Sequence, residues 1–157
     1  MEGEIYKEVC RIENLLSAWA KVKEKGSAGG IDRVTIESFE AELGKNMKEL
    51  SEQLLSYHYI PEPYQEIKIP KDDSEFRSLS LPTIRDKIVQ QAVKDIIEPM
   101  LDKEFLGVSY AYRQNKGTAK AIGRVSHVIT NEKREWVTLC DIDSYFDTIH
   151  HDILFSM

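Results

Sequence analysis

Apolar side chains recur every three or four positions along the first third of the chain. Residues 4–24 and 35–57 each carry such a stripe, which predicts an amphipathic helix in both ranges. The stretch GSAGG, 26–30, separates them, because neighbouring glycines favour a turn over a continued helix. Thr35 is predicted to cap the second helix, since its hydroxyl can accept a hydrogen bond from an amide of the first turn.

The spacing changes from helical to strictly alternating at residue 64. YQEIKIP (64–70) and FRSLSLP (76–82) alternate polar and apolar side chains around a short polar turn, which predicts a β-hairpin. Pro82 and Thr83 then open the most regular helical stripe of the chain, which reaches Leu101. A long helix is therefore expected to follow the hairpin directly.

The last third of the chain contains one predicted strand between two helices. Helical spacing returns at 118–131 and again from His151 onward. Between them, EWVTLCDI (135–142) is almost continuously apolar, which is typical of a strand buried on both faces. Such a strand needs neighbours to satisfy its backbone groups, so we expect most of its sheet to lie outside these 157 residues. The order of elements predicts an α+β fold.

Composition agrees with a globular protein and argues against a membrane protein. Apolar residues make up 41% of the chain and charged residues 31%. No run of about 18 apolar residues is present, and the N-terminus lacks the apolar core of a secretory signal. Cys10 and Cys140 show no metal-ligand spacing, so we expect free thiols and a cytoplasmic location.

Charge is unevenly distributed along the chain. The net charge of −6 disfavours a nucleic-acid partner on average. Residues 109–126 nevertheless carry four cations and no acid, which predicts a local strip able to bind phosphate. These cations are Arg113, Lys116, Lys120 and Arg124.

Three aspartates follow the predicted strand, at positions 141, 143 and 147. Carboxylates at the end of a strand are held firmly and face a cleft, which suits Mg²⁺ and its oxygen ligands. Side chains alternate along a strand, so Asp141 and Asp143 would point the same way unless a turn begins at Asp143. The alternative is that these acids are solvated and cap a strand-to-helix turn.

Two cations flank the turn of the predicted hairpin. Lys71 and Arg77 lie six residues apart, so both could reach one polyphosphate, with arginine as a bidentate fork and lysine as a point charge. The alternative is a solvated hairpin tip in which Lys71 pairs with Asp72 or Glu75.

Aromatic and basic residues alternate in the loop before the helix at 118–131. Tyr110 and Tyr112 are interleaved with Arg113, Lys116 and Lys120, and stacking combined with positive charge is how single strands are held. The alternative is that both tyrosines are buried and anchor a loop with solvated cations.

Polar side chains also open the long helix after the hairpin. Thr83, Arg85 and Gln90 could line the same groove as the loop. The alternative, which we favour here, places Arg85 and Asp86 on the surface, because the apolar stripe defines the buried face of this helix.

Four segments form an ordered series of motifs along the chain. They are AGGIDRVTIESF with LLSYHYIPEPYQEIKIPK, then RSLSLPTIRDKIVQQAVKDIIEPMLDKEF, SYAYRQNKGTAKAI and DIDSYFDTIHHDIL. Together they resemble the N-terminal part of a bacterial reverse transcriptase of the group II intron and retron type, and the combination is specific because all four blocks occur in the family's order. Ser78 stands where proline is usual, and Asp143 stands where intron enzymes often have lysine.

The resemblance implies the fingers and the first part of the palm of a right-hand polymerase. Residues 1–60 would form an N-terminal helical extension, 61–132 the fingers, and 133–157 the start of a truncated palm. Asp141 would be the catalytic carboxylate that ligates Mg²⁺, together with the backbone carbonyl of Ile142.

The resemblance also implies roles for substrate-binding residues. Lys71 and Arg77 would hold the triphosphate, Phe146 would exclude a 2′-hydroxyl, and Arg113 would line the nucleotide pocket. Contacts to nucleic acid would come from Thr83, Arg85, Gln90, Lys116 and Lys120. The implied partners are an RNA template, a DNA primer, a deoxynucleoside triphosphate and an intron or other structured RNA, without a membrane.

The family's second catalytic block, an aromatic-x-Asp-Asp hairpin, does not occur before Met157. We therefore expect a fragment that is inactive alone, with a homodimer formed through the exposed strand edge and Leu154 and Phe155. Two alternatives remain: a non-catalytic RNA-binding module, and a phosphatase of the haloacid dehalogenase type. The latter would use VTLCDIDSY, which fits that motif except at Tyr145.

Overall fold

The computed structural model describes residues 2–26, 28–70, 76–146 and 148–156. Contacts divide the chain into two compact units, Met1–Phe105 and Leu106–Met157, and each is treated by itself below. The described residues are mostly helical with one two-stranded antiparallel sheet, which confirms the predicted α+β class. None of the described helices combines the length and the apolar content needed to cross a bilayer.

The first predicted helix is in fact two helices. α1 (Glu2–Cys10) and α2 (Ile12–Glu24) meet at Arg11, whose backbone is extended with φ −62° and ψ 137°. Side chains satisfy the carbonyls exposed by this break: Asn14 Nδ2 donates to Val9 O at 3.2 Å, and Ser51 Oγ donates to Cys10 O at 2.8 Å. Because Ser51 lies 41 residues further along the chain, a tertiary contact stabilises this break.

The second predicted helix is also divided. α3 (Ile36–Ala41) and α4 (Leu43–Leu55) meet at Glu42, where φ is −118° and ψ 29°. Thr35 caps α3 as predicted: its hydroxyl accepts from Ser38 N at 3.2 Å, and the Ser38 hydroxyl accepts from Thr35 N at 2.9 Å.

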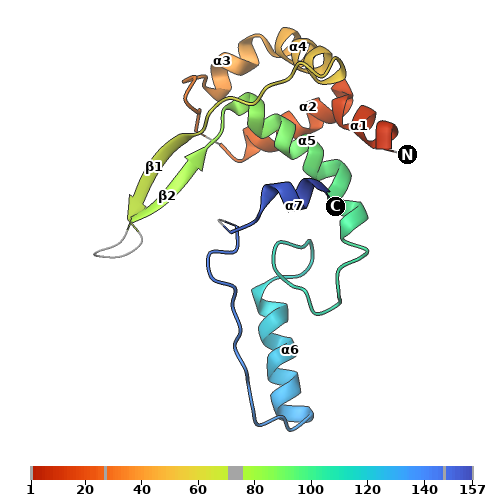
Figure 1. Cartoon of the computed structure of the whole chain (residues 1–157), viewed down its shortest axis with the longest axis vertical. Helices are drawn as coiled ribbons and strands as arrows, with labels where there is room; N and C mark the ends of the chain where they lie inside the picture. Colours follow the sequence, from red (N-terminus) through yellow and green to blue (C-terminus); the bar gives the residue numbers. More distant parts are fainter. Residues whose placement is uncertain (1, 27, 71–75, 147, 157) are drawn as a thin grey trace. The chain divides into compact units, whose positions relative to one another are not determined.

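The predicted hairpin and the long helix after it are confirmed. β1 (Gln65–Pro70) and β2 (Phe76–Leu81) pair antiparallel, with Gln65 opposite Leu81 at the base. The predicted turn, 71–75, lies outside the described residues. α5 (Ile84–Leu101) begins immediately after Thr83, which is its N-cap. Most side chains of both strands are exposed, so the hairpin projects with little apolar packing of its own (Figure 1).

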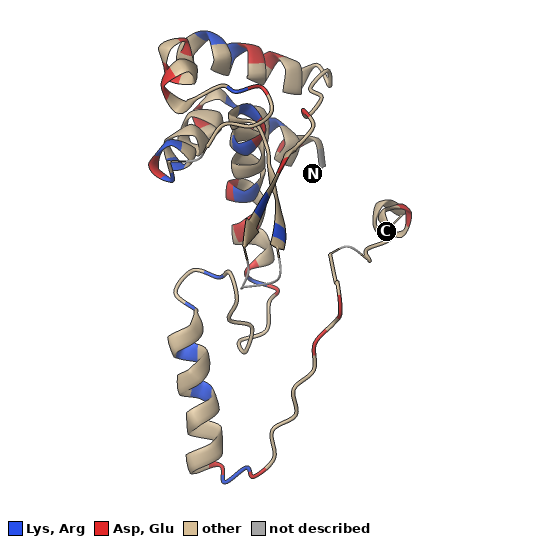
Figure 2. Ribbon diagram, turned by 90° about the vertical axis from the view of Figure 1, so that its left-hand side faces the viewer, with Lys and Arg blue, Asp and Glu red and all other residues tan. Residues whose placement is uncertain are grey.

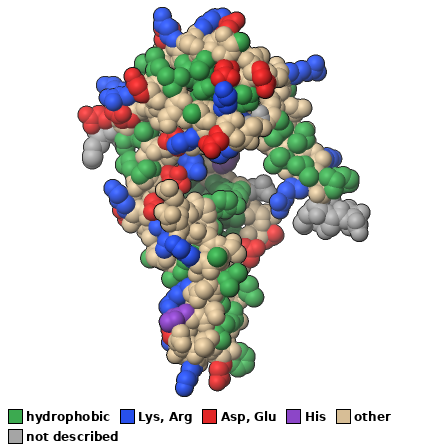
Figure 3. Space-filling view, turned by 180° about the vertical axis from the view of Figure 1, so that it is seen from behind, with side chains coloured by type: hydrophobic (Ala, Val, Ile, Leu, Met, Phe, Trp, Pro, Cys, Tyr) green, Lys and Arg blue, Asp and Glu red, His purple; other side chains and the backbone are tan. Residues whose placement is uncertain are grey.

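The core of the first unit lies between α1, α2, α4 and α5. α2 packs along α5, and the rings of Trp19 and Phe39 meet at 5.1 Å between centroids. Full burial of each large aliphatic side chain contributes roughly 1.5–3 kcal/mol, so this cluster is the main source of stability. The buried apolar residues are Val9, Cys10, Leu15, Ala18, Trp19, Val22, Phe39, Met47, Leu50, Leu54, Ile84, Ile88 and Ala92. Figure 3 shows charges of both signs interspersed on the surface.

The glycine-rich loop approaches the backbone at the start of α5. A Cβ on Gly30 would lie 2.7 Å from Thr83 N and 2.8 Å from Thr83 Cα, a distance at which real side chains are not found. Lys87 adds a hydrogen bond from Nζ to Ala28 O. The loop and the first turn of α5 therefore fit together only because residue 30 has no side chain.

The second unit differs from prediction at its central segment. α6 (Thr118–Asn131) and α7 (His151–Ser156) are present as expected. The predicted buried strand at 135–142 is wrong: the segment is exposed and is not a strand, and Leu139 is 94% accessible. The described residues of this unit supply no other strand for it to pair with, and an apolar run alone does not form a sheet. The strand edge on which the homodimer prediction relied is therefore not formed.

The two cysteines occupy opposite environments. Both are free thiols, as predicted. Cys10 is fully buried in the core, and this burial raises the pKa of its thiol. Cys140 is exposed beside Asp141.

Candidate functional site

Asp141 borders a surface hollow in the second unit. The hollow is lined by Cys140, Asp141, Ile142 and Tyr145. Asp141 is exposed, and its Oδ1 accepts a hydrogen bond from Ile142 N at 3.0 Å, which fixes one carboxylate oxygen against the backbone. Asp143 accepts instead from the hydroxyl of Ser144 at 3.3 Å. The third predicted carboxylate, Asp147, lies outside the described residues.

The donor atoms at this hollow suit Mg²⁺ but form a partial ligand set. A carboxylate and a neighbouring backbone carbonyl are the hard oxygen ligands that this ion prefers. Across the described ranges, no three side chains of the metal-binding types gather in one place. Asp141 and the carbonyl of Ile142 therefore fit a metal as contributors to a site that needs further ligands.

A tight turn after Asp143 presents two aromatic rings. Ser144 has a positive φ of 47°, and its carbonyl accepts from both Thr148 N and Thr148 Oγ1 at 3.1 Å. Phe146 is 82% exposed, and its ring meets that of Tyr145 edge-on at 5.2 Å. The turn therefore displays the Phe146 ring close in sequence to the Asp141 carboxylate.

Cationic side chains stabilise the loop before α6 by donating hydrogen bonds to its own backbone carbonyls. Arg113 donates from Nη1 to Leu106 O at 2.9 Å and to Ser109 O at 3.1 Å. Lys116 Nζ donates to Gly107 O at 2.9 Å and lies 5.3 Å from the centre of the Tyr110 ring. These cations therefore have a structural role in the loop.

The two tyrosines of this loop lie in different environments. Tyr110 is half-buried beneath Lys116, whereas Tyr112 is fully exposed with a positive φ of 56°. The alternative in which both rings are buried is therefore wrong. A hollow at the start of α6 is lined by Tyr112 and Arg113, together with Tyr110, Ala111, Gly117, Thr118 and Ala121.

α6 continues the basic strip that was predicted from the sequence. Lys120 and Arg124 are its only charged side chains (Figure 2). Lys120 Nζ donates to Asn115 O at 2.6 Å, and Arg124 pairs with Glu132 at 3.1 Å. The strip thus leads from the loop along the helix.

The hairpin displays one of its two predicted phosphate-binding cations. Arg77 is exposed on β2 and stands opposite Ile69 of β1. Lys71 lies in the segment outside the described residues. Arg77 belongs to the first unit and Asp141 to the second, so the prediction that they face one nucleotide stays a prediction.

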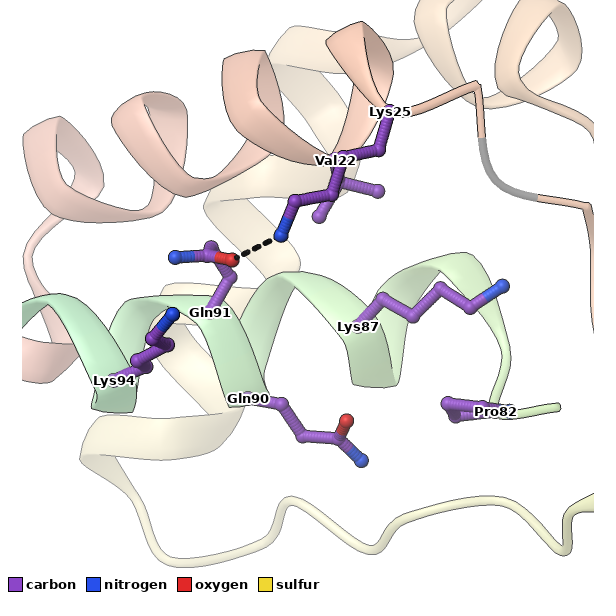
Figure 4. Close-up of a pocket in the computed structure, with 7 residues that line it drawn as sticks. All are labelled: Val22, Lys25, Pro82, Lys87, Gln90, Gln91 and Lys94. Carbon is purple, nitrogen blue, oxygen red and sulfur yellow. Dashed lines mark hydrogen bonds between the residues drawn. The ribbon is translucent and has the colours of Figure 1, made fainter. Parts of the chain in front are cut away.

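A groove between α2 and α5 brings together cations that sequence reasoning did not select. Its volume is about 340 Å³, and its lining carries no acid. Lys25 Nζ donates to Gln91 Oε1 at 3.1 Å (Figure 4). Burial lowers the pKa of Lys87. The lining residues are Val22, Lys25, Pro82, Lys87, Gln90, Gln91 and Lys94. The spacing of Lys87, Gln91 and Lys94 could have indicated from the sequence that these side chains lie on one face of the helix.

The start of α5 holds a buried carboxylate that the sequence analysis placed on the surface. Asp86 is 2% exposed, so that expectation is wrong. Its Oδ2 accepts from Thr83 Oγ1 at 2.7 Å and from Glu62 N at 3.2 Å, and its Oδ1 accepts from the Tyr59 hydroxyl. Burial and this hydrogen bond to Asp86 raise the pKa of Tyr59. The Thr-x-x-Asp spacing of a capping box could have revealed the arrangement.

The contacts around Asp86 and Tyr59 also account for the positions of Thr83 and Arg85. Thr83 is buried and its hydroxyl accepts from Asp86 N at 3.1 Å, so it caps α5 and its hydroxyl is inaccessible to nucleic acid. Arg85 is half-buried, donates to Gln53 Oε1 and lies 5.6 Å from the centre of the Tyr59 ring. Gln90 faces the groove described above.

Comparisons with known proteins give a consistent result. Residues 69–157 match the family model described as reverse transcriptase (RNA-dependent DNA polymerase), and this range includes the Asp141 segment that the phosphatase alternative also invoked. Protein YkfC of Escherichia coli K12 is 36% identical over 80% of this chain, and group II intron-encoded protein LtrA of Lactococcus lactis is 29% identical over 83%. A protein named for intron 1 of COX1/OXI3 in Saccharomyces cerevisiae is 26% identical over 98%.

The matched regions are short relative to the whole relatives. They cover 34% of YkfC, 21% of LtrA and 18% of the yeast protein. The chain thus spans between about a fifth and a third of the curated relatives that it matches.

Proposed function

The chain belongs to the reverse transcriptase family, and from this premise we propose that it supplies the fingers and the first metal-binding carboxylate of an RNA-directed DNA polymerase. The supporting observation is that the family match includes Asp141, whose exposed carboxylate borders a hollow that is also lined by Tyr145, the residue whose ring contacts the exposed ring of Phe146. The substrates in this proposal are an RNA template, a DNA primer and a deoxynucleoside triphosphate.

Two oxygen donors of this chain would hold the metal. The Asp141 carboxylate and the Ile142 carbonyl would each contribute one ligand, and further ligands would complete the coordination of the metal. Bound Mg²⁺ supplies charge stabilisation for in-line displacement at phosphorus. Phe146 would exclude a 2′-hydroxyl by a steric clash with its rigid ring, because a repulsive contact can discriminate between substrates that differ by one oxygen.

Binding of the nucleotide would involve the hairpin and the loop before α6. Arg77 and Lys71 would hold the triphosphate, because cations on an exposed hairpin can offset its charge. The loop cations Arg113, Lys116 and Lys120 donate to backbone carbonyls of the loop, and they would attract the nucleic-acid backbone while the exposed Tyr112 ring stacks on a base.

Binding of the template strand would involve the groove between α2 and α5. Gln90 contributes an amide, and Lys25, Lys87 and Lys94 contribute positive charge at this groove. Arg85, which donates to Gln53 on α4 and lies over the Tyr59 ring, would make its contact to nucleic acid separately from this groove. An intron or other structured RNA would make contacts of the same chemical kind.

The function is tested in a chimaera in which the full 157-residue chain replaces the matching N-terminal segment of an active group II intron reverse transcriptase. We expect the chimaera to extend oligo(dT) on poly(rA) with dTTP and Mg²⁺. A chimaera that binds the primer–template but incorporates no dTTP would contradict the proposal. The native parent enzyme serves as the positive control.

A second candidate function is RNA binding by this chain without catalysis, which the three lysines that line the groove favour. We expect Lys94→Ala to weaken binding of the chain to oligo(rA) about three- to tenfold at low salt and to lower the salt slope by about 0.7, because one phosphate contact is lost. Fluorescence anisotropy across a salt series measures both quantities.

Lys48→Ala is the matched control for this test, because Lys48 is an exposed lysine on α4 that pairs with Glu52 at 3.9 Å away from the groove lining. Lys48→Ala removes the same charge as Lys94→Ala and should weaken the binding of oligo(rA) less. Equal losses in the two variants would indicate general electrostatic attraction instead of a site in the groove.

A further inference from the structure

The buried carboxylate of Asp86 contacts both ends of the hairpin. Glu62, whose amide donates to Oδ2, lies three residues before β1 begins at Gln65. Thr83, whose hydroxyl donates to the same oxygen, lies two residues after β2 ends at Leu81. One side chain therefore joins the segment entering the hairpin to the segment leaving it.

Other contacts at this point support the same carboxylate. The Tyr59 hydroxyl donates to Oδ1, and the guanidinium of Arg85 lies over the Tyr59 ring while also donating to Gln53 on α4. On the other side, Gly30 approaches the backbone of Thr83 closely. The base of the hairpin is thereby connected to α4, to α5 and to the glycine-rich loop.

The hairpin itself has little other means of support. Among the described residues of its strands, only Ile67 and Leu81 are half-buried, and the others are exposed. A two-stranded hairpin whose apolar side chains are left mostly uncovered is marginally stable in water. Its orientation must therefore be determined mainly at its base, where Asp86 is the buried group that contacts both connecting segments.

We infer that Asp86 is a positioning residue that fixes the orientation of the β1–β2 hairpin and so determines how Arg77 is presented to the triphosphate. The part of this inference that concerns the triphosphate rests on the proposed function. The part that concerns the hairpin rests on the contacts of Asp86 alone.

The first test measures amide hydrogen exchange in the full chain. Asp86→Asn keeps the shape of the side chain but leaves one neutral acceptor oxygen where the carboxylate has two, so the bonds donated by Tyr59 on one side and by Glu62 N and Thr83 Oγ1 on the other cannot all be kept, and those that remain lose the strength of a charged acceptor. We expect exchange of the β1 and β2 amides to accelerate at least about tenfold. Unchanged hairpin exchange in a folded variant would overturn the inference.

Asp95→Asn is the matched control on the same helix. Asp95 Oδ1 accepts from Lys21 Nζ at 2.7 Å and from Gln91 Nε2 at 2.8 Å, and neither partner leads to the hairpin. It should accelerate exchange in α2 and α5 without a selective effect on β1 and β2. If Asp86→Asn does not fold, Tyr59→Phe removes one donor only and should show the same selectivity with a smaller amplitude.

The second test measures nucleotide kinetics in the chimaera. Asp86→Asn should raise the KM for dTTP about tenfold or more with a smaller change in kcat, and Arg77→Ala should add little in that background, because the two changes affect the same interaction. Faster hairpin exchange with an unchanged KM would support Asp86 as the positioning residue and would contradict triphosphate binding by the hairpin. Independent, additive effects on KM would overturn the proposed coupling to Arg77.

Discussion

Asp141→Asn in the chimaera is expected to reduce dTTP incorporation at least about a thousandfold, equivalent to roughly 4 kcal/mol of transition-state stabilisation. The change removes one negative charge and one oxygen ligand from a hollow whose other lining residues are Cys140, Ile142 and Tyr145, none of which has a carboxylate. The loss should appear in kcat, with primer–template affinity nearly unchanged. Single-turnover primer extension at saturating dTTP measures this directly.

Asp143→Asn is the control for that substitution. Asp143 is also exposed, lies two residues away and carries the same charge, but it bonds to Ser144 and is not among the residues that line the hollow. The control should retain activity within about tenfold, because general electrostatics near an exposed site contribute little. Comparable losses in both variants would contradict a specific ligand role for Asp141.

Gly30→Ala is expected to lower the free energy of unfolding of the first unit by about 2–4 kcal/mol, since overpacking against backbone forces the backbone to move. The added Cβ would lie 2.7 Å from Thr83 N, 2.8 Å from Thr83 Cα and 2.9 Å from Pro82 C. These are backbone atoms at the N-cap of α5, which cannot give way as a flexible side chain would. Urea denaturation followed by far-UV circular dichroism gives the change in stability.

Gly44→Ala provides a control of opposite sign. Gly44 lies in the first turn of α4, and a Cβ there would meet nothing within 4 Å. Alanine is the better helix former, so we expect this variant to be more stable by a few tenths to about 1 kcal/mol. Destabilisation by both substitutions would mean that the contact with Thr83 is not the cause of the Gly30 effect.

Local sequence patterns predicted the elements well where local physics determines them. The hairpin, α5, α6 and the Thr35 cap follow from alternation, helical spacing and capping chemistry within a few residues. The breaks at Arg11 and Glu42 were missed, because helical spacing continues through them. The first depends in part on Ser51, whose hydroxyl reaches the exposed Cys10 carbonyl from α4.

The least successful prediction was the strand at 135–142. An apolar run carries information about burial, but a strand also requires a partner that satisfies its backbone groups. The surface position predicted for Asp86 was wrong for a related reason, because a charged residue next to an apolar stripe is usually exposed. The Thr-x-x-Asp spacing could have indicated the contact with Thr83, but Tyr59 and Glu62 lie more than twenty residues earlier in the chain and only the fold brings them to Asp86.

Cys140 is a native labelling site for spectroscopy. This thiol is exposed and immediately precedes Asp141, whereas Cys10 is enclosed in the core. A nitroxide label would therefore attach selectively at residue 140 without engineered cysteines. Broadening of its electron paramagnetic resonance spectrum by added Mn²⁺ would then report ion occupancy beside the carboxylate, independently of any turnover.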